Sequence, residues 1–159
     1  MIQKIKPFLW FDSQAEEAAK FYCSVFKNSR MLDVARYPEG SPAPAGSVMI
    51  ASFELEGIQF VALNAGPPFK FTEVISFVVT TETQEETDYY WNKLTADGGQ
   101  ESACGWLKDK FGLSWQITPK QLIDLLSNKD KATATRVMQA MMTMHKIDIA
   151  TLERAAAGK

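Results

Sequence analysis

The residues most able to carry chemistry form a charged triplet among large aromatic side chains. The triplet Lys108-Asp109-Lys110 stands between Trp106 and Trp115. A lysine ammonium can bind an anionic ligand, and a lysine–aspartate pair can act as acid and base. The alternative interpretation is a solvated turn between two strands, and the sequence leaves both open.

Other residues whose types could take part in catalysis or binding have simpler explanations. Glu16-Glu17 and Glu85-Glu86 resemble paired catalytic carboxylates, but both pairs fall in the first turns of predicted helices, where acids complement the helix dipole. His145, the single histidine, belongs to a predicted C-terminal tail. Cys23 and Cys104 form no Cys-x-x-Cys unit, and we expect them to be reduced thiols.

Composition and charge limit the class of protein. The chain has 159 residues, of which 46% are hydrophobic and 23% charged, as in an ordinary globular protein. A net charge of −2 disfavours nucleic acid as a partner, because phosphates need a basic surface. No apolar run approaches the roughly 20 residues that cross a membrane, and the N-terminal residues lack a signal-peptide pattern. We therefore expect a cytoplasmic protein with neither nucleic acid nor membrane as its partner.

The first half of the chain predicts a strand–helix–strand–strand–strand module over about residues 1–66. A helix is expected to begin after the polar pair Asp12-Ser13 and to reach about Lys27, because apolar residues recur at helical spacing from Ala18 to Phe26. Strands are expected over residues 5–11, 31–37, 48–55 and 58–64. The Pro- and Gly-rich residues 38–46 form a loop long enough to act as a flap.

The same pattern restarts over about residues 70–119. We expect a strand over 74–80, a helix from Thr81 to Ala96, and strands over 100–106 and 112–118. Shifting the sequence brings Glu16-Glu17 onto Glu85-Glu86, which indicates a duplication. A second copy would cover the sheet face that a single copy leaves exposed.

A helical tail is predicted over about residues 120–159. One helix covers 120–126, Asp130 caps a second, and Asp148 caps a third. Because these helices are short and amphipathic, they must pack on the chain's own sheet or on a partner subunit. We therefore expect one α+β domain over residues 1–159 and a homodimer.

Several segments resemble one known protein family. They are Pro7–Phe11, Glu16–Phe26, Gln84–Trp91, Gly98-Gly99, Cys104–Pro119, Arg136–Met142 and Lys146–Ala150. Together with the doubled module, they are similar to the PhnB-like branch of the glyoxalase/bleomycin-resistance/extradiol dioxygenase superfamily, which has the vicinal oxygen chelate fold. The resemblance implies two βαβββ modules that form a curved mixed sheet. It also implies the label that this branch often carries, demethylubiquinone 3-methyltransferase.

The resemblance further implies where a metal would bind. Superfamily enzymes hold a divalent ion with His, Glu or Gln side chains from the first and last strands of each module, and the ion acts as a Lewis acid. The corresponding strands here offer amides and hydroxyls, which are poor ligands for zinc or nickel, and no carboxylate or imidazole. A glycine-rich turn for adenosylmethionine is also missing after the first strand. We therefore expect no metal and no other cofactor.

The remaining hypothesis is a ligand pocket on the sheet. The candidate ligand-binding residues are Trp10, Gln59, Asn64, Ser76, Trp106, Lys108, Trp115 and Gln116. The alternative is that each residue has only a structural role, with the aromatic side chains in the core and the amides at strand ends. The predicted function is binding of a small, partly aromatic or anionic molecule in the sheet cavity without a catalytic metal. The alternative is an enzyme, either a divergent metal-dependent lyase, isomerase or dioxygenase, or the methyltransferase of the family label.

Overall fold

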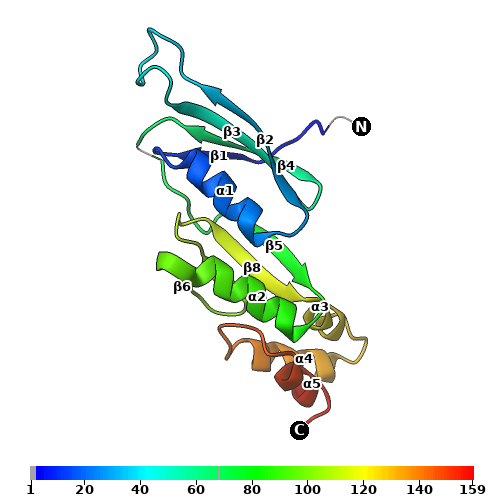
Figure 1. The fold of residues 1–159 in the computed structure, drawn as a ribbon. Coiled ribbons are helices and arrows are strands. Elements are labelled where there is room, and N and C mark those ends of the chain that lie inside the picture. The colour runs from blue at the N-terminus through cyan, green and yellow to red at the C-terminus, as the bar shows by residue number, and fades with distance from the viewer. Residues whose placement is uncertain (1–2, 68) are drawn as a thin grey trace. The chain divides into compact units, whose positions relative to one another are not determined.

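The computed structural model describes residues 3–67 and 69–159 and forms two compact units, Met1–Lys70 and Phe71–Lys159. The first unit contains β1 (Phe8–Phe11), α1 (Ala15–Val25), β2 (Ser29–Arg36), β3 (Val48–Leu55) and β4 (Ile58–Asn64). Its sheet has the order β1-β4-β3-β2, in which β1 and β4 are parallel and the other neighbours antiparallel. Helix α1 lies across one face of this sheet (Figure 1).

The second unit repeats this topology and adds the tail. It contains β5 (Ser76–Thr81), α2 (Gln84–Thr95), the 3-10 turn η1 (Ala96–Gly98), β6 (Gln100–Glu101), β7 (Trp106–Lys108) and β8 (Ser114–Pro119). The sheet order is β5-β8-β7-β6, and β5 runs parallel to β8 as β1 does to β4. The predicted α+β class and the two βαβββ modules are confirmed. No helix of the described residues is both long and apolar enough to span a membrane.

The start of α1 differs from the prediction. The helix begins at Ala15, and neither Asp12 nor Ser13 caps it, because the N-cap position is Gln14, whose side chain makes no capping hydrogen bond. Instead, the Ala15 N–H donates to Asn64 Oδ1 of β4 at 2.7 Å. A side chain from the last strand therefore supplies the acceptor that the sequence pattern assigned to a local residue. The helix ends at Val25, two residues before the predicted end.

The predicted strand over 100–106 is also wrong as one element. It divides into β6 and β7 around a turn in which Cys104 (φ 59°) and Gly105 (φ 84°) both adopt left-handed backbone conformations. At Gly105 a side chain would place its Cβ 2.8 Å from the Ile117 carbonyl oxygen. The close approach lets the Ile117 N–H donate to the Gly105 carbonyl at 2.8 Å, so β8 is tied to this turn.

The long loop and the tight hairpin of the first unit agree with the sequence. Residues 38–46 contain no helix or strand, and their ends are joined by hydrogen bonds between Tyr37 and Ser47 and between Gly46 and Tyr37, both at 2.9 Å. Glu56 and Gly57 connect β3 to β4 with φ values of 47° and 81°. Two positive φ values in a two-residue turn match the twist of an antiparallel hairpin.

Each helix covers the buried face of its own sheet. In the first unit, Tyr22 of α1 stacks on Phe53 with ring centroids 5.9 Å apart, and Phe53 stacks on Phe60 at 5.3 Å. In the second unit, Trp91 and Leu94 of α2 are buried, as are β-strand residues such as Ile117. Burial of side chains of this size contributes roughly 1.5–3 kcal/mol each. The faces turned away from α1 and α2 are called the open faces below.

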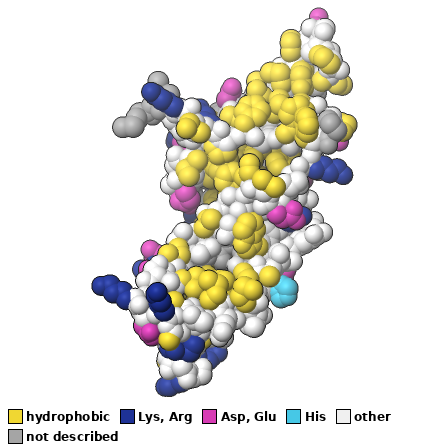
Figure 2. Space-filling view, turned by 180° about the vertical axis from the view of Figure 1, so that it is seen from behind, with side chains coloured by type: hydrophobic (Ala, Val, Ile, Leu, Met, Phe, Trp, Pro, Cys, Tyr) yellow, Lys and Arg dark blue, Asp and Glu magenta, His cyan; other side chains and the backbone are white. Residues whose placement is uncertain are grey.

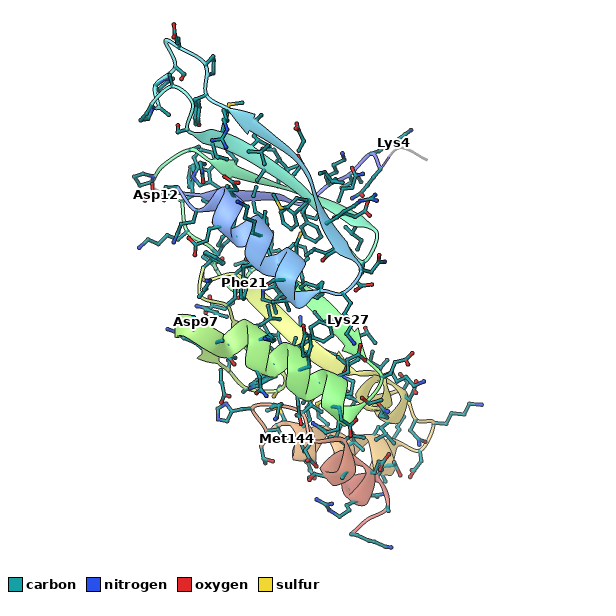
Figure 3. All side chains as sticks on the ribbon, viewed as in Figure 1. Lys4, Asp12, Phe21, Lys27, Asp97 and Met144 are labelled. Atoms are coloured by element: carbon teal, nitrogen blue, oxygen red, sulfur yellow. The ribbon has the colours of Figure 1, made fainter. Side chains whose placement is uncertain are left out.

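The tail forms α3 (Lys120–Leu126), α4 (Lys131–Met141) and α5 (Ile149–Ala156) around a small core of Leu122, Val137, Ile147 and Leu152. The predicted caps are confirmed, since Asp130 accepts from Ala132 and Thr133 and Asp148 accepts from Thr151. The tail packs on its own chain through the segment between α4 and α5, which contains Met144 (Figure 3). There the Met144 carbonyl accepts from the Cys104 N–H at 2.8 Å, and Gln84 of α2 bonds the backbone of Ile147 and Ile149.

Candidate functional site

Four of the predicted ligand-binding residues share the open face of the second unit. Trp106 pairs with Gln116, Lys108 pairs with Ser114, and Ser76 pairs with Ser114, so these residues point to one side of the sheet. The alternate residues of β7 and β8, Leu107, Trp115 and Ile117, are buried on the side of α2. The structure therefore brings Ser76, Trp106, Lys108 and Gln116 together on one surface.

A small pocket opens at this surface. Its volume is about 140 Å³, and it is lined by Glu73, Gln100, Glu101, Ser102, Trp106, Leu107, Lys108 and Ser114. It can therefore accommodate the polar head of a small ligand, while larger parts would extend past its rim.

Ser114 is the least solvated polar group of the pocket. Its side chain is 1% exposed, and its hydroxyl has no hydrogen-bond partner among the described residues. A buried hydroxyl without a partner costs about 1–3 kcal/mol, and most such groups in native proteins are paired. The hydroxyl oxygen exposes less than 1 Å² of surface, so a ligand atom in the pocket reaches it only after a small shift of the pocket wall.

Lys108 supplies the positive charge of the pocket. Its Nζ lies 2.5 Å from Oε1 of Glu73, and the lysine side chain is 33% exposed. The hydrogen bond from Lys108 holds the pKa of the Glu73 carboxyl below its ordinary value, so this carboxyl is ionised near neutral pH. The pocket therefore contains an ammonium that already binds a carboxylate.

The burial of Asp109 shows that the charged triplet 108–110 is not simply a solvated turn. The residue is only 2% exposed. Its Oδ1 accepts from the backbone N–H groups of Phe111 (2.9 Å) and Leu113 (3.1 Å), and its Oδ2 accepts from Trp115 Nε1 at 2.9 Å. The carboxylate therefore holds the β7–β8 turn in shape, and this turn begins at Lys108 and ends at Ser114.

The other predicted residues lie elsewhere in their units. Trp115 is in the core beneath α2, with its ring 5.6 Å from that of Phe77. Gln116 donates to Ser76 Oγ at 2.9 Å, beside the pocket and outside its lining. These two amide and hydroxyl groups extend the polar surface along β8 and β5.

In the first unit, the predicted residues are divided between two faces. Trp10 lies on β1, where its Nε1 donates to the Gly66 carbonyl at 2.7 Å and its ring meets Phe69 edge-on at 5.0 Å. Gln59 on β4 pairs with Glu54 of β3. Asn64 uses both ends of its amide, since Oδ1 accepts from Ala15 and Nδ2 donates to the Val48 carbonyl at 3.1 Å. Asn64 therefore joins β4, β3 and the start of α1.

A larger cavity, of about 860 Å³, lies within the first unit at the start of α1. Its lining comprises Asp12, Ser13, Glu16, Glu17, Tyr37, Pro42, Ala43, Pro44, Ser47, Val48, Asn64, Ala65 and Gly66. The predicted flap contributes Pro42, Ala43 and Pro44 to the lining, and Asp12 stands near the start of α1 (Figure 3). Glu16 bonds Lys20 at 2.7 Å, and this contact lowers the pKa of the Glu16 carboxyl. The open face of this unit carries many hydrophobic side chains (Figure 2).

The side chains that most often ligate metal ions are dispersed among the residues that the structure describes. No three His, Cys, Asp or Glu side chains of residues 3–67 and 69–159 gather at one point. His145 is exposed in the tail, and its Nδ1 lies 3.0 Å from the Ser102 carbonyl oxygen. Glu85 and Glu86 occupy the first turn of α2, as predicted.

Sequence reasoning missed Ser114, Glu73 and Glu101 as pocket residues. The alternation of Ser114 with Gln116 on β8 was a usable signal, because residues two apart on a strand share a face. No local pattern marked Glu73, which precedes β5 and reaches Lys108 from 35 positions away in the sequence.

Two mixed sheets of βαβββ topology, each with a helix on one face, define an α+β protein of the glyoxalase, or vicinal oxygen chelate, class. The sequence profile described as 3-demethylubiquinone-9 3-methyltransferase matches residues 3–118. The chain belongs to this PhnB-like family. The profile match ends before α3, so the resemblance of the tail segments to the family stays a prediction.

Solved structures agree with this assignment. A PhnB protein of Bacillus cereus, to which 3-demethylubiquinone-9 3-methyltransferase activity is provisionally ascribed, is 40% identical, with a TM-score of 0.68 over 74% of this chain and 99% of that chain. Two further solved structures share the fold. Protein PA1353 of Pseudomonas aeruginosa is 20% identical, with a TM-score of 0.61 over 74% of this chain and 98% of that chain. The fosfomycin resistance protein FosX of Mesorhizobium loti is 12% identical, with a TM-score of 0.52 over 72% of this chain and 90% of that chain. No curated protein gives a significant match.

Proposed function

We propose that this chain binds a small anionic molecule with an aromatic part at the pocket between β7, β8 and Glu73, without a catalytic metal. The observation that carries the proposal is the buried, unpartnered hydroxyl of Ser114 in a pocket that also contains the Lys108 ammonium. A carboxylate placed there accepts from both groups, and hydrogen bonds between charged groups are the stronger kind. Lys108 thus supplies the positive charge that a metal ion supplies to the substrate in metal-dependent members of the superfamily.

Trp106 supports the aromatic part of the proposal. Its side chain is half-buried and lines the pocket on the same face as Lys108. A planar group on the ligand can stack on the indole while its carboxylate reaches inward. Ser76 and Gln116, next along the face, add polar groups at the rim.

Calorimetric titration with 3-phenylpropionate tests the proposal. We expect one molecule bound per chain, with unchanged affinity after treatment with EDTA and no stoichiometric metal by elemental analysis. Lys108→Gln should weaken binding at least tenfold. The matched control is Lys110→Gln, on the same turn but outside the pocket lining. Equal affinity of the wild type and Lys108→Gln would overturn the proposal, as would failure of both 3-phenylpropionate and its α-amino derivative L-phenylalanine to bind.

Methyl transfer is the second candidate function, and the description of the matching family favours it. It requires that the chain bind S-adenosylmethionine. A ligand present at 100 times its Kd stabilises the folded state by about 2.7 kcal/mol, which a thermal melt detects. A melt that S-adenosylmethionine leaves unchanged would count against this function and leave the anion-binding proposal standing.

A further inference from the structure

The ammonium that lines the pocket is already paired with a carboxylate, and this pairing constrains the ligand. The ionisable lining residues of the pocket are Lys108, Glu73 and Glu101. Glu73 is paired with Lys108 at 2.5 Å, and Glu101 Oε1 accepts from Trp91 Nε1 at 2.8 Å. Glu101 pairs with the buried Leu107 on the side of α2, so the Lys108 ammonium faces one carboxylate, that of Glu73, before any ligand arrives.

A ligand that is only an anion fits this arrangement poorly. To reach the Lys108 ammonium it must share or displace the Glu73 carboxylate, which leaves that carboxylate without its partner. The added negative charge also lies beside Glu73, whose carboxylate is exposed to solvent, so the repulsion is modest. The lost contact of Glu73 is replaced if the ligand itself brings a positive group for that carboxylate.

We infer that the ligand is a zwitterion, whose carboxylate binds Lys108 and Ser114 and whose ammonium binds Glu73; this inference rests on the proposed function. An α-amino acid carries both charges on one carbon. Because Lys108 Nζ and Glu73 Oε1 are already in contact, the two groups of such a ligand can reach them together. The lowered pKa of Glu73 keeps its carboxylate ionised for this role.

The size of the pocket and the position of Trp106 extend the inference to the class of amino acid. A volume of about 140 Å³ holds the charged head group, and the side chain then extends past the rim beside Trp106. An indole attracts both flat aromatic groups and nearby cations. An aromatic amino acid therefore offers a partner to each of Lys108, Glu73 and Trp106.

Three probes of similar shape test the inference by calorimetry: L-phenylalanine, 3-phenylpropionate, which lacks the ammonium, and phenethylamine, which lacks the carboxylate. The wild type should bind L-phenylalanine about tenfold more tightly than 3-phenylpropionate, the equivalent of one added charged hydrogen bond. Phenethylamine should bind more weakly than both.

Glu73→Gln should change the two acid probes in opposite directions. L-phenylalanine should bind about tenfold more weakly, because its ammonium loses its partner. The affinity for 3-phenylpropionate should rise roughly two- to fivefold, because the exposed Glu73–Lys108 pair no longer competes for the lysine. Glu85→Gln, at an exposed position of α2 outside the pocket, is the control and should change neither affinity.

The outcomes separate this inference from the proposed function. Binding of 3-phenylpropionate with equal or weaker binding of L-phenylalanine would overturn the zwitterion inference alone. Equal losses for both probes in Glu73→Gln would also overturn it, since they would indicate a structural role for Glu73. Failure of both L-phenylalanine and 3-phenylpropionate to bind would overturn the proposed function together with this inference.

Discussion

Replacing Ser114 with alanine should make the free protein more stable and its ligand binding weaker. The hydroxyl is buried at 1% exposure and has no partner among the described residues. An unsatisfied hydroxyl costs about 1–3 kcal/mol, so its removal should stabilise the folded state by about 1 kcal/mol after the small loss of packing. For a chain of this length, that gain raises Tm by roughly 2–4 °C.

The same substitution should cost binding energy when the ligand is present. The lost hydrogen bond from Ser114 to a ligand carboxylate is of the charged kind, worth about 1.5–3 kcal/mol, so the affinity for 3-phenylpropionate should fall at least tenfold. Urea denaturation without ligand and calorimetric titration with ligand measure the two effects separately. Ser52→Ala, at a half-buried strand position of the first unit, is the control and should leave the affinity unchanged.

A gain in stability with a loss of affinity is hard to produce by misfolding, which lowers both. If Ser114→Ala destabilised the free protein by 1 kcal/mol or more, the hydroxyl would have a partner within the fold. If the affinity stayed the same while stability rose, the hydroxyl would not contact the ligand. Either result would refute the reasoning.

Three further predictions follow from the fold. Asn64→Leu should destabilise the protein by roughly 1–3 kcal/mol in urea, because two backbone groups lose their partner, and Asn64→Asp, which keeps the acceptor, should cost less; equal costs would contradict this. The Lys146 contact and the Thr151 cap lower the folded-state pKa values of Asp88 and Asp148. The stability that they contribute is therefore present above about pH 4 and should be lost as the pH falls through the lowered folded-state pKa values, with a flatter curve for Asp88→Asn. Exposed Met142 (64%) on the tail supports a homodimer, so sedimentation at micromolar concentration should give the mass of two chains, and Met142→Glu should weaken association; a wild type with the mass of one chain would contradict this.

Much of the fold could be predicted because the signals were local. Apolar residues at helical spacing predicted α1 and α2, and alternation predicted β3, β4 and β8. The duplication was visible because both halves repeat the same order of elements. The caps Asp130 and Asp148 were correct because a capping side chain bonds within three residues of itself.

The errors occurred where distant residues decide the structure. Asn64 takes the place of a local cap because β4 ends beside the first turn of α1. Asp109 is buried because Trp115 and the turn amides surround its carboxylate, although its charged neighbours in the sequence indicated exposure.

The candidate site was predictable only in part. The sequence analysis proposed Trp106, Lys108, Trp115 and Gln116 as ligand-binding residues. In the structure, strand alternation places Trp106, Lys108 and Gln116 on one face and Trp115 on the opposite face. Glu73 needed the tertiary structure, since only folding brings the segment before β5 to Lys108.

The most direct test of the binding site is a map of amide and indole NMR shifts during titration with 3-phenylpropionate. The account predicts that the changes concentrate on Trp106, Lys108 and Ser114, and that Lys108→Gln removes them. Changes centred on the cavity of the first unit, around Asp12 and Tyr37, would contradict the account, as would no changes at all.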